Sequence, residues 1–199
     1  MERQSHYFDK DPSAQSLESS VELVLPDMTR SFITDRGVFS NRRIDPGTKF
    51  LLLEAPLPDI PPNRVLDLGC GYGPIAAVMQ HRFPDAEVWA TDTNNRALAL
   101  TSRNLQQGNV MVRRPEDIPH ETRFDLIWSN PPVRIGKENM VALLSLWIGR
   151  LEPTGSAVLV VNKNLGSDSL HKRMEREGWQ VKRLKSYQGY RLLEVRNNA

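Results

Sequence analysis

The tripeptide Asn130-Pro131-Pro132 follows the apolar segment FDLIWS and presents two hydrogen-bond acceptors on a constrained backbone. Neither proline has a backbone N–H, and each biases the residue before it toward extended geometry. The Asn130 side-chain oxygen and the Pro131 carbonyl can therefore accept from the two N–H groups of a planar amine on an aromatic ring. This arrangement would point the amine's delocalised lone pair at an electrophile, without a strong base. The alternative interpretation is that the tripeptide only ends a strand.

A second candidate site is the glycine-rich segment VLDLGCGYG, residues 65–73, where a buried strand runs into a tight loop. Gly69, Gly71 and Gly73 allow the backbone to approach a ligand closely. The G-x-G-x-x-G fingerprint of dinucleotide-binding proteins is absent, because Pro74 stands where its third glycine should be. The pattern therefore argues against a dehydrogenase. A tight strand-to-helix turn with no ligand would also favour glycine.

Two further strand ends carry carboxylates. Asp92, next to Thr93, ends the following strand about twenty residues on, where it could accept both hydroxyls of a ribose. Glu116 and Asp117 follow a third strand, where Asp117 could accept from an adenine amino group while backbone amides near Ile118 contact the ring. Asp117 is alternatively a plain loop residue. Cys70 is expected to fill the glycine turn as a small residue and to take no part in catalysis.

These residues are held by a pattern of alternating strands and helices that begins near Arg64. Apolar runs suited to burial on both faces, separated by helical segments, predict a mainly parallel, doubly wound Rossmann-like sheet. The expected strands are 64–69, 87–92, 109–114, 124–130, 155–162, 179–187 and 190–196; the expected helices are 74–83, 95–106, 137–151 and 168–177. The last two strands are close enough to form a hairpin, so one of them must run antiparallel.

The first 55 residues are expected to form an N-terminal extension of a single domain whose core covers residues 56–199. VELVLP and RSFITD, residues 21–26 and 30–35, predict a β-hairpin. A loop then leads into a short helix near residues 48–54 and a proline-rich link. In the polar first twenty residues, only His6, Tyr7 and Phe8 are suited to docking on the fold.

Composition limits the class of protein. The 199 residues suffice for one domain with a full core. They contain neither an apolar run long enough to span a membrane nor a secretory signal, so a cytoplasmic location is expected, with no membrane partner. One cysteine excludes an internal disulfide, and the four histidines show no ligand spacing, so no metal is expected.

The net charge is only +2, but basic residues are concentrated in two stretches, 28–50 and 161–199. The first has a local charge of +3 and the second of +5. Each is either a phosphate-contacting face or a solvated surface.

Together, the glycine loop, Asp92 and N-P-P resemble the class I S-adenosylmethionine-dependent methyltransferases, and within them the small-domain type that includes small-subunit ribosomal RNA guanine-N2 methyltransferases. The resemblance covers most of the chain. It is strengthened by GVFS at residues 37–40, by D-P-G-T at 45–48 followed by Leu51-Leu52, and by HYF at 6–8.

The resemblance implies S-adenosylmethionine as cofactor and a sheet of order 3-2-1-4-5-7-6 with strand 7 antiparallel. Asp92 and Thr93 would bind its ribose, and Asp117 and Ile118 its adenine. Phe39 and Ser40 would cover the pocket, with Asn130, Pro131 and Pro132 lining the methyl-acceptor site. The methionine part would contact the segment made of Asp67, Gly69, Cys70, Gly71 and Gly73.

Two departures leave the acceptor open. Val133 stands where related enzymes often carry an aromatic residue for stacking, and the chain has no room for an additional RNA-recognition domain. The favoured hypothesis is methylation of the N2 amine of a guanine in ribosomal RNA, with the two basic stretches holding the backbone. The alternatives are a small molecule or a protein glutamine amide as acceptor, or a non-catalytic scaffold that binds RNA or a partner. The protein could be a monomer or a homodimer.

Overall fold

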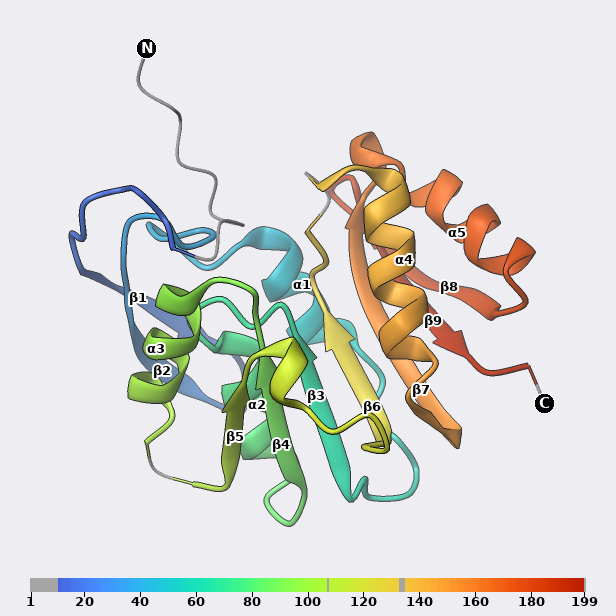
Figure 1. The fold of residues 1–199 in the computed structure, drawn as a ribbon, viewed down its shortest axis with the longest axis horizontal. Coiled ribbons are helices and arrows are strands. Elements are labelled where there is room, and N and C mark those ends of the chain that lie inside the picture. Colours follow the sequence, from blue (N-terminus) through green and yellow to red (C-terminus); the bar gives the residue numbers. More distant parts are fainter. Residues whose placement is uncertain (1–10, 107, 133–134, 199) are drawn as a thin grey trace.

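The computed structural model describes residues 11–106, 108–132 and 135–198, so residues 6–8 and Val133 lie outside the described part of the chain. The core is a seven-stranded sheet of order β5-β4-β3-β6-β7-β9-β8 (Figure 1). Its strands are β3 (Arg64–Leu68), β4 (Glu87–Thr91), β5 (Val110–Arg113), β6 (Phe124–Ser129), β7 (Leu151–Asn162), β8 (Gln180–Tyr187) and β9 (Tyr190–Arg196).

β9 pairs antiparallel with both β7 and β8, whereas the other pairs are parallel. Counted from β3, this is the expected order 3-2-1-4-5-7-6 with the seventh strand antiparallel. The predicted fold class is therefore confirmed, including the N-terminal hairpin. The hairpin is formed by β1 (Ser19–Val24) and β2 (Thr29–Thr34), with Val21 opposite Phe32.

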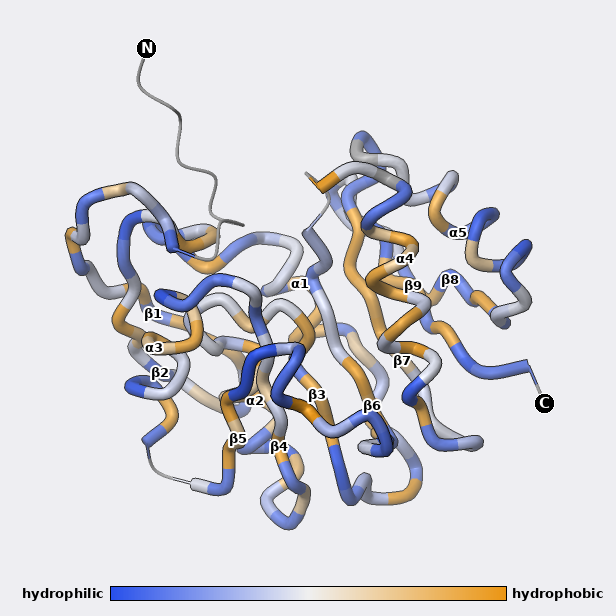
Figure 2. Tube along the Cα trace, viewed as in Figure 1, coloured by the Kyte–Doolittle hydropathy of each residue, from blue (hydrophilic) through white to orange (hydrophobic). Residues whose placement is uncertain are grey.

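Helices cover the two faces of the sheet in separate groups. α1 (Pro46–Glu54), α2 (Pro74–Arg82) and α3 (Asn95–Asn104) share one apolar cluster with the hairpin and with Val65 and Trp128 of the sheet. α4 (Lys137–Ile148) and α5 (Ser167–Arg176) pack on Leu66 and Ile127, which point to the other face. Figure 2 shows the hydrophobic colour concentrated on the central strands and on α4.

Some element boundaries differ from the expected ones. β7 begins at Leu151 rather than 155, because Leu151 pairs with Phe124 and the Phe124 N–H donates to the Arg150 carbonyl. α4 accordingly ends at Ile148. Short 3-10 turns, η1 (Pro115–Asp117) and η3 (Lys163–Leu165), follow β5 and β7.

No helix in the residues covered by the structure is long and apolar enough to cross a membrane.

Candidate active site

A cavity of about 220 Å³ lies at the carboxyl ends of β3, β4, β6 and β7, where an open α/β sheet places its ligands. Eight residues singled out from the sequence line it: Phe39, Gly69, Gly71, Asp92, Thr93, Asn130, Pro131 and Pro132. The fold thus brings the glycine loop and N-P-P into one cavity.

The glycine loop is fixed by backbone hydrogen bonds to the next strand. The N–H groups of Gly69 and Cys70 both donate to the Thr91 carbonyl, at 2.9 and 3.0 Å. Gly69 and Gly71 have φ values of +81° and +58°, and a Cβ at either position would meet no atom within 4 Å. These two residues therefore expose bare backbone to an open space, as close binding of a ligand requires.

Asp92 places a carboxylate in the part of the cavity next to the glycine loop. Its two oxygens accept from the N–H of Gly71 at 3.0 Å and from the N–H of Asn94 at 2.9 Å. Burial raises the pKa of Asp92 above its ordinary value, and the backbone donors partly oppose that shift. Remaining lone pairs on the two oxygens can accept from hydroxyl groups of a ligand, so the donor set fits a ribose.

Asp67 lies outside the cavity lining. It is fully buried, and one of its oxygens accepts from the Ala76 N–H at 2.9 Å, at the start of α2. Its other oxygen has no partner in the described residues. Burial, with a smaller contribution from Asp92, raises the pKa of Asp67 to about 8.

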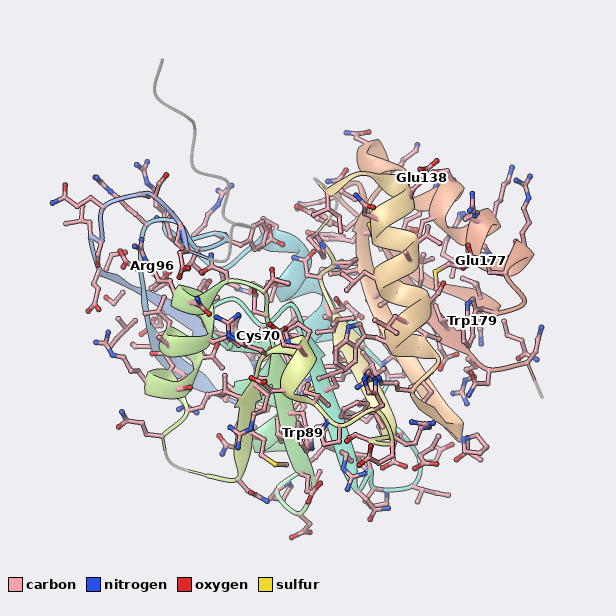
Figure 3. All side chains as sticks on the ribbon, in the orientation of Figure 1. Cys70, Trp89, Arg96, Glu138, Glu177 and Trp179 are labelled. Carbon is pink, nitrogen blue, oxygen red and sulfur yellow. The ribbon has the colours of Figure 1, made fainter. Side chains whose placement is uncertain are left out.

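Five other residues proposed from the sequence are also absent from the cavity lining: Ser40, Cys70, Gly73, Asp117 and Ile118. Gly73 caps α2 with φ +93°, and Asp117 is exposed in η1. Cys70 is buried at the centre of the fold (Figure 3), and burial raises the pKa of its thiol well above the usual range. Burial therefore disfavours the thiolate, which is the nucleophilic form of cysteine.

Asn130 is held in one orientation by two side chains from the start of α1. Its Nδ2 donates to Asp45 Oδ1 at 2.8 Å and to Thr48 Oγ1 at 3.0 Å. Asp45 is the N-cap of α1 and also accepts from the Thr48 N–H at 2.9 Å. Because both amide hydrogens are used, the Asn130 Oδ1 is left as an acceptor beside the two prolines.

The segment before α1 covers the cavity from the side of the N-terminal extension. Val38 and Phe39 line the cavity, and Asn94 Nδ2 holds the Gly37 carbonyl at 2.8 Å. Arg96 extends from α3 toward this segment (Figure 3) and lies 3.6 Å from the buried carboxylate of Asp35. The extension is thereby fastened to the loop after β4.

Sequence reasoning missed eleven residues that line the cavity. Asn162 could have been found, because it ends a parallel strand at the same sheet edge, and Tyr190 opens the antiparallel strand paired with it. Val38 and Asp45 belong to the GVFS and D-P-G-T motifs, although no role was predicted for either residue. The rest carry no comparable signal in the sequence. The eleven are Val38, Asp45, Leu68, Thr91, Asn94, Ala97, Pro115, Leu143, Trp147, Asn162 and Tyr190.

Comparison with known families agrees with this geometry. The family model described as "Methyltransferase small domain" matches residues 29–194, so the chain belongs to that family. It is an S-adenosylmethionine-dependent methyltransferase. The open backbone at Gly69 and Gly71 and the carboxylate of Asp92 fit that cofactor.

Among individual relatives, "Uncharacterized protein YbxB" of Bacillus subtilis (strain 168) is 28% identical and covers 96% of this chain and 98% of its own. "Ribosomal RNA small subunit methyltransferase C" of Hahella chejuensis is 35% identical over 69% of this chain and 42% of its own. The enzyme of that name from Shewanella loihica is 30% identical over 80% of this chain and 52% of its own. The chain thus spans about half the length of these two relatives or less.

A solved structure has the same fold. The "T. Thermophilus 16S rRNA N2 G1207 methyltransferase (RsmC) in complex with AdoMet and Guanosine" superposes with a TM-score of 0.76 at 24% identity. The match covers 92% of this chain and 52% of that one.

Proposed function

We propose that this methyltransferase acts on the exocyclic N2 amine of a guanine in ribosomal RNA. The observation that carries the proposal is the orientation of Asn130, whose Nδ2 is bound by Asp45 and Thr48. This leaves Oδ1 to accept an N–H inside the cavity that also contains Asp92. An amine conjugated with a purine ring needs such an acceptor, because its lone pair is delocalised.

The protein's part in the reaction is mainly orientation. The bound cofactor supplies an electrophilic methyl group. Asn130 Oδ1 would accept one N–H of the amine and favour the geometry in which the nitrogen lone pair faces that methyl. Pro131 and Pro132 keep this part of the backbone rigid. The N-methylated product is a cationic, acidic amine, so its proton can leave without a strong base.

The charged surface favours RNA over a small acceptor. Arg42 and Arg43 are exposed and lie in the chain between Phe39 and Asp45, which both line the cavity. Neither has an ion-pair partner in the part of the chain that the structure describes. Both are therefore available to phosphates near the mouth of the cavity.

The C-terminal basic stretch is less available, since many of its charges are already paired. Carboxylate partners are present for Arg173, Lys185, Arg191 and Arg196, and also for Arg183. We therefore assign the main phosphate contacts to 28–50, with 161–199 in a secondary role. A target base would have to leave its stack to reach Asn130.

The names of the relatives support the same substrate. Two of them are ribosomal RNA methyltransferases by name, and the solved structure with the shared fold is of an N2-guanine enzyme with guanosine bound.

The first test is transfer of radiolabelled methyl from S-adenosylmethionine to RNA from cells lacking this protein. Naked ribosomal RNA and ribosomal subunits should be compared, and the modified nucleoside identified by chromatography and mass. We expect N2-methylguanosine, formed by the wild-type protein and not by Asn130→Ala. Label in protein or small molecules, with none in any RNA, would replace guanine by one of the alternative acceptors.

The second test reverses charge at the cavity mouth. The double variant Arg42→Glu/Arg43→Glu should raise the KM for RNA about tenfold or more at low salt and flatten its salt dependence. The comparison variant is Lys172→Glu/Lys182→Glu, which makes the same charge change at exposed positions of α5 and β8 that have no carboxylate partner in the described residues. These positions lie in the stretch with the secondary role, so this variant should have the smaller effect. Equal effects of the two double variants would overturn the assignment of the main phosphate contacts to 28–50.

A further inference from the structure

The wall of the cavity near Asn130 is completed by two residues for which the sequence predicted no role. Asn162 is the last residue of β7 and Tyr190 the first of β9, and the two are paired across the antiparallel ladder. The Lys163 N–H donates to the Gly189 carbonyl at 2.6 Å just beyond this pair. Both residues line the same cavity as Asn130. The backbone of both residues is therefore fixed by strand pairing.

The ring of Tyr190 lies against the start of α1. A Cβ on Gly47 would be 2.6 Å from Tyr190 Cε1 and 2.9 Å from Asp45 Oδ1. Only glycine leaves room for the ring at this position. The Cα of Gly47 therefore lies close both to the Tyr190 ring and to the Asp45 carboxylate, which accepts a hydrogen bond from Asn130. The aromatic ring and the proposed amine acceptor are neighbours, joined through Asp45.

Tyr190 is better placed than the other aromatic side chains of the cavity lining. Trp147 is 1% exposed and lies in the apolar cluster of α4, on the opposite face of the sheet. Phe39 lies on the covering loop and is 38% exposed. The Tyr190 ring, in contrast, lies next to Gly47 and Asp45 at the start of α1.

The polar groups of the pair are available. Asn162 Oδ1 accepts from the Asn164 N–H at 2.9 Å, which fixes the amide so that Nδ2 is the free end. Within the described residues, neither that nitrogen nor the Tyr190 hydroxyl has a hydrogen-bond partner. The cavity wall therefore offers a flat ring and an N–H donor beside Asn130.

We infer that Tyr190 and Asn162 form the subsite for the acceptor ring: Tyr190 stacks on a purine, and Asn162 Nδ2 donates to a ring acceptor near the exocyclic amine. This inference rests on the proposed function and names the residues that select its acceptor. It also supplies an aromatic residue for stacking, since the position after N-P-P is Val133 and not an aromatic residue in this chain. Stacking contributes binding without contact to the methyl donor, so its loss should appear in KM.

The test compares Tyr190→Leu with Tyr190→Phe in steady-state methyl transfer to ribosomal RNA. Tyr190→Leu should raise the KM for RNA about tenfold or more, with a smaller effect on kcat, because base–aromatic stacking is lost. Tyr190→Phe keeps the ring and should stay within about threefold of wild type, the range expected for loss of a hydroxyl that has no hydrogen-bond partner in the described residues. The matched control is Tyr187→Leu on the same hairpin, 56% exposed and outside the cavity lining. Calorimetric affinity for S-adenosylmethionine reports whether each variant is folded.

A second variant, Asn162→Asp, keeps an oxygen for the Asn164 N–H and removes the donor. It should also raise the KM for RNA, and it carries the test if Tyr190→Leu fails to fold. Wild-type KM values in both Tyr190→Leu and Asn162→Asp, with RNA methylation intact, would overturn the subsite and leave the proposed function standing.

Binding of guanosine to protein saturated with S-adenosylhomocysteine separates the two hypotheses further. Guanosine binding that is lost in Tyr190→Leu, from a protein that methylates no RNA, would support the subsite and overturn the RNA substrate. Guanosine binding unchanged in Tyr190→Leu would overturn the subsite whatever the RNA result.

Discussion

The two halves of the cavity are built in different ways. The cofactor half consists mainly of backbone, with one carboxylate, from two consecutive strand ends, and Gly69, Gly71 and Asp92 lie within a span of 24 residues. The acceptor half consists of single side chains from distant segments, since Asn130 is held by Asp45, 85 positions away. A binding site made mainly of backbone can be common to many enzymes that use the same cofactor. A site made of single side chains can differ between enzymes that act on different acceptors. Substitutions in the two halves should therefore affect different measurements.

Asn130→Ala should have the largest effect, and only on the acceptor half. Loss of one preorganised hydrogen-bonding group costs about 10²–10³ in kcat. We expect a decrease of that size in methyl transfer, with the affinity for S-adenosylmethionine within about threefold of wild type, since the glycine loop is untouched. Single-turnover kinetics and calorimetry measure the two quantities. A comparable loss of cofactor affinity would show that the halves are not separable.

Gly71→Ala should produce the opposite pattern, a loss of cofactor binding. The new Cβ would enter the cavity from a backbone with φ +58°, where a side chain costs about 1–2 kcal/mol. We expect the dissociation constant for S-adenosylmethionine to rise about tenfold or more.

The control for this strain is Gly178→Ala, at φ +94° with no atom within 4 Å, in the turn between α5 and β8. It should lower the melting temperature similarly and leave cofactor affinity unchanged. Equal affinity losses in the two variants would trace the effect to general destabilisation and not to the cavity.

Thr48→Val tests whether the acceptor half depends on orientation of Asn130. The buried Thr48 hydroxyl accepts from Asn130 Nδ2, and valine removes that acceptor at similar volume. We expect kcat to fall about tenfold, corresponding to one hydrogen bond, with KM for RNA little changed. Thr48→Ser keeps the hydroxyl and should restore most of kcat. Failure of serine to do so would assign the loss to packing.

The fold was more predictable than the site because its signals are local. Alternating strand and helix patterns, and the short link between β8 and β9, are sufficient for a mainly parallel sheet with one antiparallel strand. The strand order itself was expected only from the resemblance to methyltransferases. Gly69, Gly71 and Asp92 follow from the rule that ligands bind at the carboxyl ends of parallel strands. Pairing of Asp45 with Asn130 depends on how α1 packs against the sheet, and no local pattern contains that information. The roles of Asp67 and Asp117 remain predictions, and neither residue lines the cavity.

The last expected effect is on the stability of the cofactor half and not on activity. Asp67 is fully buried with one unpartnered oxygen, and its pKa is raised to about 8. The native protein therefore retains a proton that the unfolded chain releases above about pH 4. Its contribution to the free energy of unfolding is complete below that pH and is lost progressively as pH rises to about 8.

Asp67→Asn should flatten the pH dependence of the free energy of unfolding between about pH 4 and pH 8, because an amide does not titrate. Compared with wild type, the variant should be most stabilised near pH 8. Denaturant unfolding of the cofactor-free protein at several pH values measures the slope, with Asp59→Asn in the exposed linker as the control for loss of one charge. An identical slope in wild type and Asp67→Asn would mean that the carboxylate is ionised in the native state. The buried charge beneath the glycine loop would then have to be stabilised by the loop itself. In that case the two halves would differ in electrostatics as well as in construction, since the acceptor half pairs its own carboxylate, Asp45, with the amide of Asn130.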